Sequence, residues 1–292
     1  MTQKIETLVA EELAIPVDKR VVALAAKIAK AHGKASRAVL FYGSCLREKQ
    51  YDGLMLDFYL IVSNYAAAYS RRWLAVANRL IPPNVFVFEA DGMMAKYAVL
   101  SEADFHRLNG PETRNVSVWA RFAQPSRLVW AANDAARKKV IAAVSRAAPT
   151  LLASAILAVP GSDDPLDLWR GAFKLTYSAE LRAERRGRSG SFVEFDPERY
   201  GRFTEPAIKA IATMKGPRAS GGWGRRRVEG KMLTVLRLAK ASATFAGGVD
   251  YIAWKINRHA GTEIEIKPWQ RRWPLLAAIS LVPKLLRSGA VR

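Results

Sequence analysis

Two short apolar runs, separated by a Gly-Ser turn and a polar stretch, dominate residues 38–63 (AVLFYGSCLREKQYDGLMLDFYLIVS). The first run ends at Tyr42 and the second covers residues 54–62, and both favour β-strands. Because the stretch between them is basic and polar, we predict strand, turn, short helix or loop, and strand. Asp57 interrupts the second strand, and a carboxylate in an apolar strand is costly unless a partner offsets its charge.

Amphipathic spacing predicts helices on either side of this segment. In residues 17–31, Val21, Leu24 and Ile28 share one helical face, which we expect to pack on the central sheet. Asp164-Pro165 is typical of a helix start. Further helices are predicted at residues 65–80, 133–158 and about 166–185.

Residues 84–101 predict a β-hairpin, because two β-favouring runs flank the turn pair Asp91-Gly92. Asp91 is therefore interpreted as a turn residue. Lys96 alternates with apolar neighbours on the second strand, so it lies either on a solvated face or beside bound phosphates. The basic, glycine-bearing segment 215–231 predicts a mobile phosphate-facing loop or a linker.

Charge and composition limit the classes of function that the chain can have. The chain has 292 residues, half of them hydrophobic, and this length predicts two domains. Its formal net charge of +20 predicts an anionic partner. Nucleic acid, an anionic membrane surface and phosphorylated substrates all remain open as partners. One cysteine and three histidines are too few for a Cys/His zinc site. We predict neither a signal peptide nor a membrane span, and hence a soluble or peripheral protein.

The Gly43-Ser44 turn and Asp57 together suggest phosphate chemistry. A turn or helix start can offer backbone N–H groups to a triphosphate, and Asp57 can hold the Mg²⁺ that accompanies it. Gly-Ser followed by an apolar strand with an embedded Asp is typical of nucleotidyltransferases. The alternative is a βαβ unit of any α/β domain, in which Asp57 forms a salt bridge.

Five segments occur along the chain in the order FYGSCLRE (41–48), MLDFYLIV (55–62), ADGMMAKYAVLS (90–101), WARFAQP (119–125) and KLTYSAELR (174–182). In this order they resemble the mitochondrial-type CDP-diacylglycerol synthases, the translocator assembly and maintenance family of phosphatidate cytidylyltransferases. The resemblance covers roughly residues 39–185. This chain differs in having Cys45 and Ala98 where the family has Gly, and Glu180 where it has Asp. Position 59 is Tyr59, so the second strand Asp of polymerases is absent; the family also has a single Asp in this strand.

The resemblance implies an α+β fold with three parts. A polymerase-β-like nucleotidyltransferase domain with a small mixed sheet is expected at 1–132, and a mainly helical, winged-helix-like domain at 133–245. A basic amphipathic membrane-binding segment is expected at 246–292. Residues 267–292 support that last part directly, because they contain six basic residues and no acid. The implied location is cytoplasmic, peripherally attached to the inner face of the membrane.

The resemblance also implies that CMP passes from CTP to phosphatidic acid, giving CDP-diacylglycerol and pyrophosphate. Mg²⁺ is the expected cofactor, an anionic membrane the expected surface, and no nucleic acid is expected. A nucleotidyltransferase for RNA or protein, or a non-catalytic nucleic-acid-binding protein, remains an alternative; the oligomeric state is left open. Expected catalytic residues are Asp57, Lys96 and Glu180, with Asp57 and Glu180 on the metal and Gly43, Ser44, Arg121 and Arg182 binding substrates.

Overall fold

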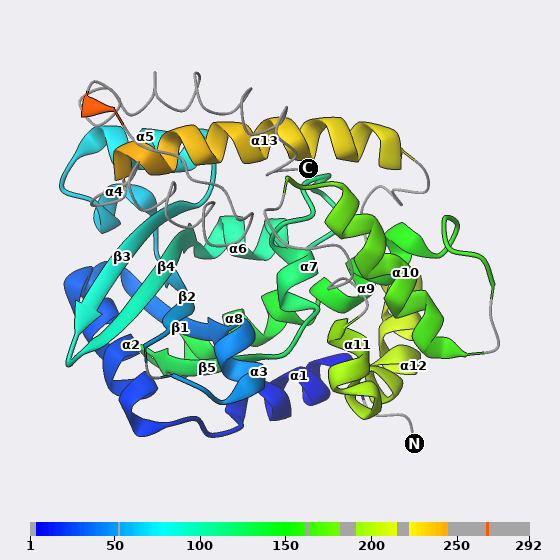
Figure 1. Cartoon of the computed structure of the whole chain (residues 1–292). Coiled ribbons are helices and arrows are strands. Elements are labelled where there is room, and N and C mark those ends of the chain that lie inside the picture. Colours follow the sequence, from blue (N-terminus) through cyan, green and yellow to red (C-terminus); the bar gives the residue numbers. More distant parts are fainter. Residues whose placement is uncertain are drawn as a thin grey trace.

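Five strands form a mixed sheet in the order β3-β4-β2-β1-β5 (Figure 1). The computed structural model describes residues 4–51, 53–161, 164–181, 191–214, 222–244 and 267–268. Strand β2 pairs in parallel with β4, and the other neighbouring pairs are antiparallel. The strands are β1 (Ser36–Tyr42), β2 (Met55–Val62), β3 (Asn84–Ala90), β4 (Met93–Ser101) and β5 (Ser126–Ala131).

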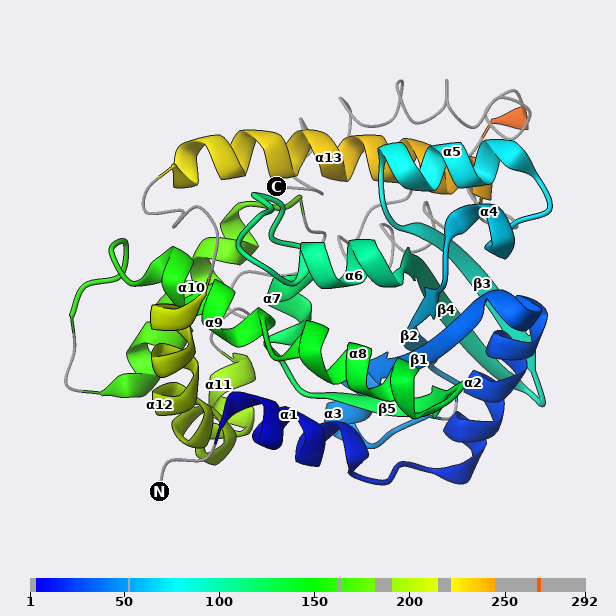
Figure 2. The same cartoon turned by 180° about the vertical axis from the view of Figure 1, so that it is seen from behind.

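Helices surround this sheet, so the chain has the expected α+β class with a small mixed sheet. In both views, helices α9 to α12 gather beside the sheet, and α5 and α13 follow one edge of the molecule (Figures 1 and 2). The described helices are α1 (Ile5–Ala14), α2 (Lys19–Ala31), α3 (Ser44–Glu48), α4 (Tyr65–Ala68), α5 (Arg72–Leu80), α6 (Glu102–Leu108), α7 (Trp119–Phe122), α8 (Asp134–Val144), α9 (Ala147–Ala155), α10 (Pro165–Ser178), α11 (Ser191–Phe195), α12 (Pro197–Thr213) and α13 (Trp223–Thr244).

Side chains of β2 alternate between two buried layers, as strand geometry requires. Phe58 and Leu60 join one core cluster, which includes the apolar face of α2 and so confirms that prediction. Tyr59 and Ile61 join the other cluster, together with α1 and residues of α6 to α12. Asp57 shares the face of Tyr59, so its carboxylate points towards the helical side of the sheet.

The predicted hairpin is confirmed. Asp91 and Gly92 connect β3 and β4 with φ values of 53° and 72°. Positive φ at both central residues is the geometry of the type I′ turn that suits a two-residue hairpin loop. The Asp91 carboxylate also lies 2.6 Å from Lys27 Nζ, and this ion pair links the turn to α2.

Two predicted long helices are each broken in the structure. Residues 65–80 form α4 and α5, because Tyr69 adopts an extended conformation and its hydroxyl accepts a hydrogen bond of 2.9 Å from Asn78 Nδ2. Residues 133–158 form α8 and α9. Pro149 is the third residue of α9, and its ring and missing N–H are incompatible with a helix that continues from α8.

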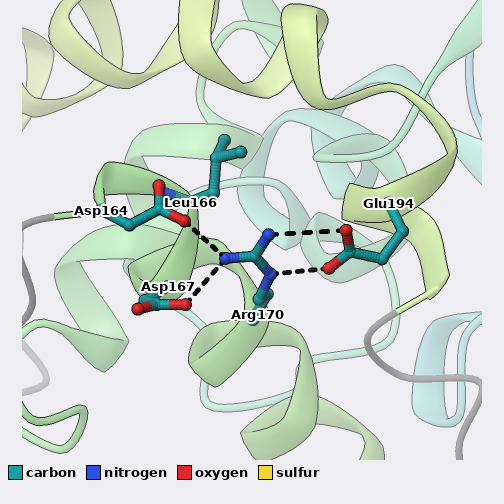
Figure 3. A network of polar contacts seen from close by, with 5 residues as sticks. All are labelled: Asp164, Leu166, Asp167, Arg170 and Glu194. Atoms are coloured by element: carbon teal, nitrogen blue, oxygen red, sulfur yellow. Dashed lines mark hydrogen bonds and ion pairs between the residues drawn. The ribbon is translucent and has the colours of Figure 1, made fainter.

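The helix predicted at 166–185 begins as expected but ends at Ser178. Asp164 caps its start by accepting a 2.8 Å hydrogen bond from the Leu166 N–H. Arg170 pairs with Asp164, Asp167 and Glu194, each at 2.7 Å, and thereby links α10 to α11 (Figure 3).

Helix α13 crosses the end of α10 at close range. A Cβ on Gly230 would lie 2.1 Å from the carbonyl oxygen of Ala179, so only glycine permits this approach. The prediction of a loop at 215–231 is wrong for residues 223–231, which are the first turns of α13. Residues 215–221 lie outside the described part of the chain.

One core cluster contains residues from both sides of the predicted domain boundary at residue 132. Tyr59 and Phe122 precede the boundary, and Val140, Trp169 and Tyr200 follow it. The two predicted domains therefore share buried apolar surface, and the boundary itself stays a prediction. Among the helices described, none combines the length and the apolar character needed to cross a bilayer.

Candidate functional site

Asp57 and Lys96 face each other across the parallel pair β2–β4. They are register partners, and Lys96 Nζ lies 2.8 Å from Asp57 Oδ1. Both side chains are about a quarter exposed, so the ion pair is partly open to solvent. This ion pair offsets part of the cost of placing a carboxylate in an apolar strand, as the salt-bridge alternative predicted.

Gly43 brings the turn after β1 directly against this carboxylate. Its φ is +96°, and a Cβ on it would lie 3.0 Å from Asp57 Oδ2. Glycine is therefore favoured both by the backbone conformation and by the lack of room. Ser44 follows at the start of α3 and is exposed. Burial, together with the charge of Asp57, raises the pKa of the Cys45 thiol, which disfavours a thiolate there.

Arg121 reaches the same face of the sheet from α7. Its Nη1 donates to the Tyr59 hydroxyl at 3.3 Å and to the Ser117 carbonyl at 3.2 Å. Its guanidinium carbon lies 5.2 Å from the ring centroid of Tyr42, within the range of a cation–π contact. These contacts hold the guanidinium over the strand positions next to Asp57.

Both predicted metal ligands, Asp57 and Glu180, act on Arg121 through their charges. Burial on its own lowers the pKa of Arg121, but neighbouring tyrosines and the charges of Glu180 and Asp57 outweigh that effect and raise it well above its usual value. Glu180 is therefore close enough to act on the same guanidinium. It lies beyond the end of α10 and not on the predicted helix. Arg182 lies outside the described residues.

Arg237 of α13 was not identified from the sequence. Its Nη1 donates to Ser117 Oγ at 2.9 Å and its Nε to the Pro82 carbonyl at 2.8 Å, while its Nη2 is buried without a hydrogen-bond acceptor in the described structure. Burial lowers its pKa, and Glu180 and Tyr59 oppose that shift. Because 120 residues separate Arg237 from Ser117, no local pattern could have indicated the contact.

Lys240 was missed for the same reason. It lies three residues after Arg237, hence on the same side of α13, and donates to the carbonyls of Ile81 and Pro83. Burial, with a smaller contribution from the charge of Arg237, lowers the pKa of Lys240 to about 7. The two side chains fasten α13 to the segment between α5 and β3.

The Asp57 carboxylate is compatible with nucleotide-bound Mg²⁺. Asp57 Oδ1 is buried, and no donor in the described structure makes a hydrogen bond with it, although Lys96 forms an ion pair with it. Mg²⁺ that accompanies a nucleotide needs one or two protein carboxylates, since substrate phosphates supply further oxygens. Among the described residues, no group of three or more His, Cys, Asp or Glu side chains gathers as a metal site.

A scan of the sequence against models of known protein families finds no match, and a search of curated proteins finds no significant match either.

Proposed function

We propose that this protein is a nucleotidyltransferase that moves CMP from CTP to phosphatidic acid and releases pyrophosphate. One observation carries the proposal: a glycine turn, a cation and an arginine from separate stretches of the sequence converge on one strand carboxylate. Gly43 contacts Asp57, Lys96 forms an ion pair with it, and Arg121 is held over the adjacent strand position, where Glu180 also acts on it.

The same proposal includes an assignment of the three parts of the chain to known kinds of domain. A turn with Gly43 and Ser44 after β1, and Asp57 on the neighbouring strand β2, support a polymerase-β-like nucleotidyltransferase domain at 1–132. The helices that follow β5 would then form the winged-helix-like part, and residues 246–292 the membrane-binding segment. In this proposal CTP binds against the turn, and the lipid phosphate lies on the helical side of the sheet.

The protein groups in this reaction mainly position charge. Gly43 and Ser44 face the triphosphate, and Lys96 and Arg121 offset negative charge on its oxygens. Asp57 and Glu180 would hold Mg²⁺, which when bound polarises phosphate oxygens. A phosphatidate oxygen forms the new bond to the α-phosphorus of CTP, and the bond to the β-phosphate breaks.

A transfer assay tests the proposal. The full chain is incubated with Mg²⁺, α-labelled CTP and either phosphatidate dispersed in detergent or RNA. We expect label in a lipid product, and less product from ATP, GTP or UTP. Label on RNA would favour the alternative acceptor, and no transfer combined with RNA binding would favour the non-catalytic alternative.

Asp57→Asn should abolish turnover while leaving the fold intact. The amide keeps the shape of the carboxylate but loses the charge, so several kcal/mol of transition-state stabilisation should be lost, on the order of a thousandfold in kcat/KM. Circular dichroism and thermal melting check the fold. Asp91→Asn is the matched control, because Asp91 is a turn residue paired with Lys27 away from this site. If Asp57→Asn retains most of the wild-type turnover, the metal assignment is wrong.

A further inference from the structure

Helix α5 has its apolar side chains on the outside. Trp73, Val76 and Leu80 are 45%, 57% and 72% exposed. Their spacing of three and four residues places them on one helical face. Asn78 is fully buried on the opposite face, so the polarity of this helix is inverted relative to that of an ordinary surface helix.

Hydrogen bonds of Asn78 fix this orientation. Its Nδ2 donates to the Tyr69 hydroxyl at 2.9 Å and to the Val99 carbonyl at 3.0 Å, and its Oδ1 accepts from the Asn84 N–H at 2.7 Å. Rotating α5 to bury its apolar face would leave these buried polar groups without partners, which is costly. The apolar face is therefore held outward by the rest of the fold.

Unpaired arginines accompany the apolar face. Arg72 and Arg79 are exposed on α5 next to the apolar residues, and Arg71 precedes the helix. Within the part of the chain that the structure describes, none of the three forms an ion pair, and residues 64–88 contain no Asp or Glu. Helix α5 thus combines exposed apolar side chains with positive charge, and the sequence on either side of it supplies no acid as far as residue 88.

Helix α13 lies along the same edge of the molecule as α5 (Figures 1 and 2). In both views α5 and α13 lie along the same edge, and Lys240 and Arg237 hydrogen-bond to the carbonyls of residues 81–83 just after α5 (Figures 1 and 2). Along α13, exposed apolar side chains recur every four residues, at Val228, Met232 and Leu236. The apolar character of the edge is therefore not confined to one helix.

We infer that the exposed face of α5 is a docking surface for an anionic lipid bilayer, with Trp73, Val76 and Leu80 inserted at the level of the headgroups. Aromatic and aliphatic side chains on one face with flanking arginines are typical of helices that lie in a membrane interface. Anionic headgroups supply the counter-charge that Arg72 and Arg79 do not have among the described residues. The inference deepens the proposed function, and rests on it for the source of the lipid, but its test measures binding and not turnover.

Flotation with vesicles tests the surface. The full chain is mixed with phosphatidylcholine vesicles that contain phosphatidylglycerol, and no phosphatidate, so that binding of the substrate headgroup does not contribute. Trp73→Ser with Leu80→Ser removes apolar contacts, and Arg72→Gln with Arg79→Gln removes charge. We expect each pair to lower the partition coefficient about tenfold or more, since each charge or buried side chain contributes measurably.

Matched controls come from elsewhere on the surface. Ile156→Ser with Leu157→Ser removes exposed apolar side chains, Leu157 being 76% exposed, from a stretch (147–161) that contains no Lys or Arg. Arg137→Gln with Lys138→Gln removes the same charge from the exposed face of α8. Both controls should change the partition coefficient by less than about twofold.

Several outcomes would overturn the inference. They are no binding of the wild-type chain to these vesicles, equal effects of α5 and control pairs, or an effect of the arginine pair alone. A melting temperature several degrees lower for the apolar pair would show that protein covers this face. Turnover on phosphatidate in detergent separates the two ideas: vesicle binding without any CMP transfer leaves the surface assignment standing and refutes the proposed function.

Discussion

Gly43 lies where the turn after β1 approaches the Asp57 carboxylate, and this contact is sensitive to a single methyl group. Gly43 has a φ of +96° and 3.0 Å between its missing Cβ position and Asp57 Oδ2. Gly33 also has a positive φ, of +52°, but nothing lies within 4 Å of its Cβ position. An alanine at Gly33 therefore introduces a side chain at positive φ without crowding any neighbouring atom, whereas an alanine at Gly43 also crowds the Asp57 carboxylate.

Gly43→Ala should therefore reduce both stability and activity, whereas Gly33→Ala should reduce stability alone. An alanine at Gly33 costs about 1 kcal/mol. The cost at Gly43 is higher, about 1–3 kcal/mol, because its φ of 96° and ψ of −163° lie in a region almost restricted to glycine. In Gly43→Ala the carboxylate must also move, and a displacement of a fraction of an ångström should lower kcat/KM about tenfold or more. Urea unfolding and the CMP-transfer assay measure the two effects. Equal activity of the two variants would remove Gly43 from the site.

At the scale of the element, helix α13 is the least well predicted from the sequence, and it makes several contacts around the candidate site. Its Arg237 shares Ser117 with Arg121, and its Gly230 lies against Ala179, immediately before Glu180. The helix therefore contacts both the α7 side and the α10 side of the candidate site. Its attachment to residues 81–83 depends partly on Lys240.

The buried Lys240 predicts a pH dependence of stability. The pKa of Lys240 is about 7 in the folded chain and that of an ordinary lysine is 10.5. Between these values the unfolded chain binds more protons than the folded one, so the stability contribution of this group increases as the pH rises through that window. From pH 7 to pH 9 the gain should be roughly 2 kcal/mol.

Urea unfolding at pH 7 and pH 9 measures this gain. Lys240→Met keeps the aliphatic stem without a titrating group, so the variant should lose that part of the pH dependence. Lys231→Met on the exposed side of the same helix should behave as wild type. The assignment is contradicted if Lys240→Met and wild type gain equally between the two pH values.

At the scale of the whole molecule, a buried ion pair joins the first helix to α12. Arg199 Nη2 donates to Glu12 Oε1 at 3.0 Å and its Nε to Glu12 Oε2, while its Nη1 donates to the Ala123 carbonyl at 3.0 Å. The Ser126 N–H donates to the same glutamate. One carboxylate thus connects α1, the start of β5 and α12, which lie on both sides of the predicted domain boundary.

Glu12→Gln should destabilise the fold by about 3–5 kcal/mol, because it leaves the Arg199 charge buried without its counterion. Glu11 provides the control, since it pairs with Arg202 at 3.6 Å between the same two helices but at the surface. Glu11→Gln should cost less than about 1 kcal/mol. Chemical denaturation compares the three proteins, and similar small losses in both variants would mean that Glu12 and Arg199 are not buried in solution.

The sequence by itself determined the elements that depend on neighbouring residues. The strands around Gly43, the positive-φ turn at Asp91, the apolar face of α2 and the cap at Asp164 all follow from propensities and spacings within about a dozen residues. Helix breaks were predicted less well. The break at Tyr69 depends on a hydrogen bond to Asn78 that exists only in the folded core.

Only the tertiary structure decided which side chains meet. Asp57 and Lys96 are neighbours because β2 and β4 pair in parallel although α4, α5 and β3 separate them in sequence. Arg237 reaches the site because α13 packs back across the molecule. The outward apolar face of α5 likewise depends on Asn78 and its distant partners. A local pattern defines the faces of an element, but packing against residues far away in the chain selects which face is buried.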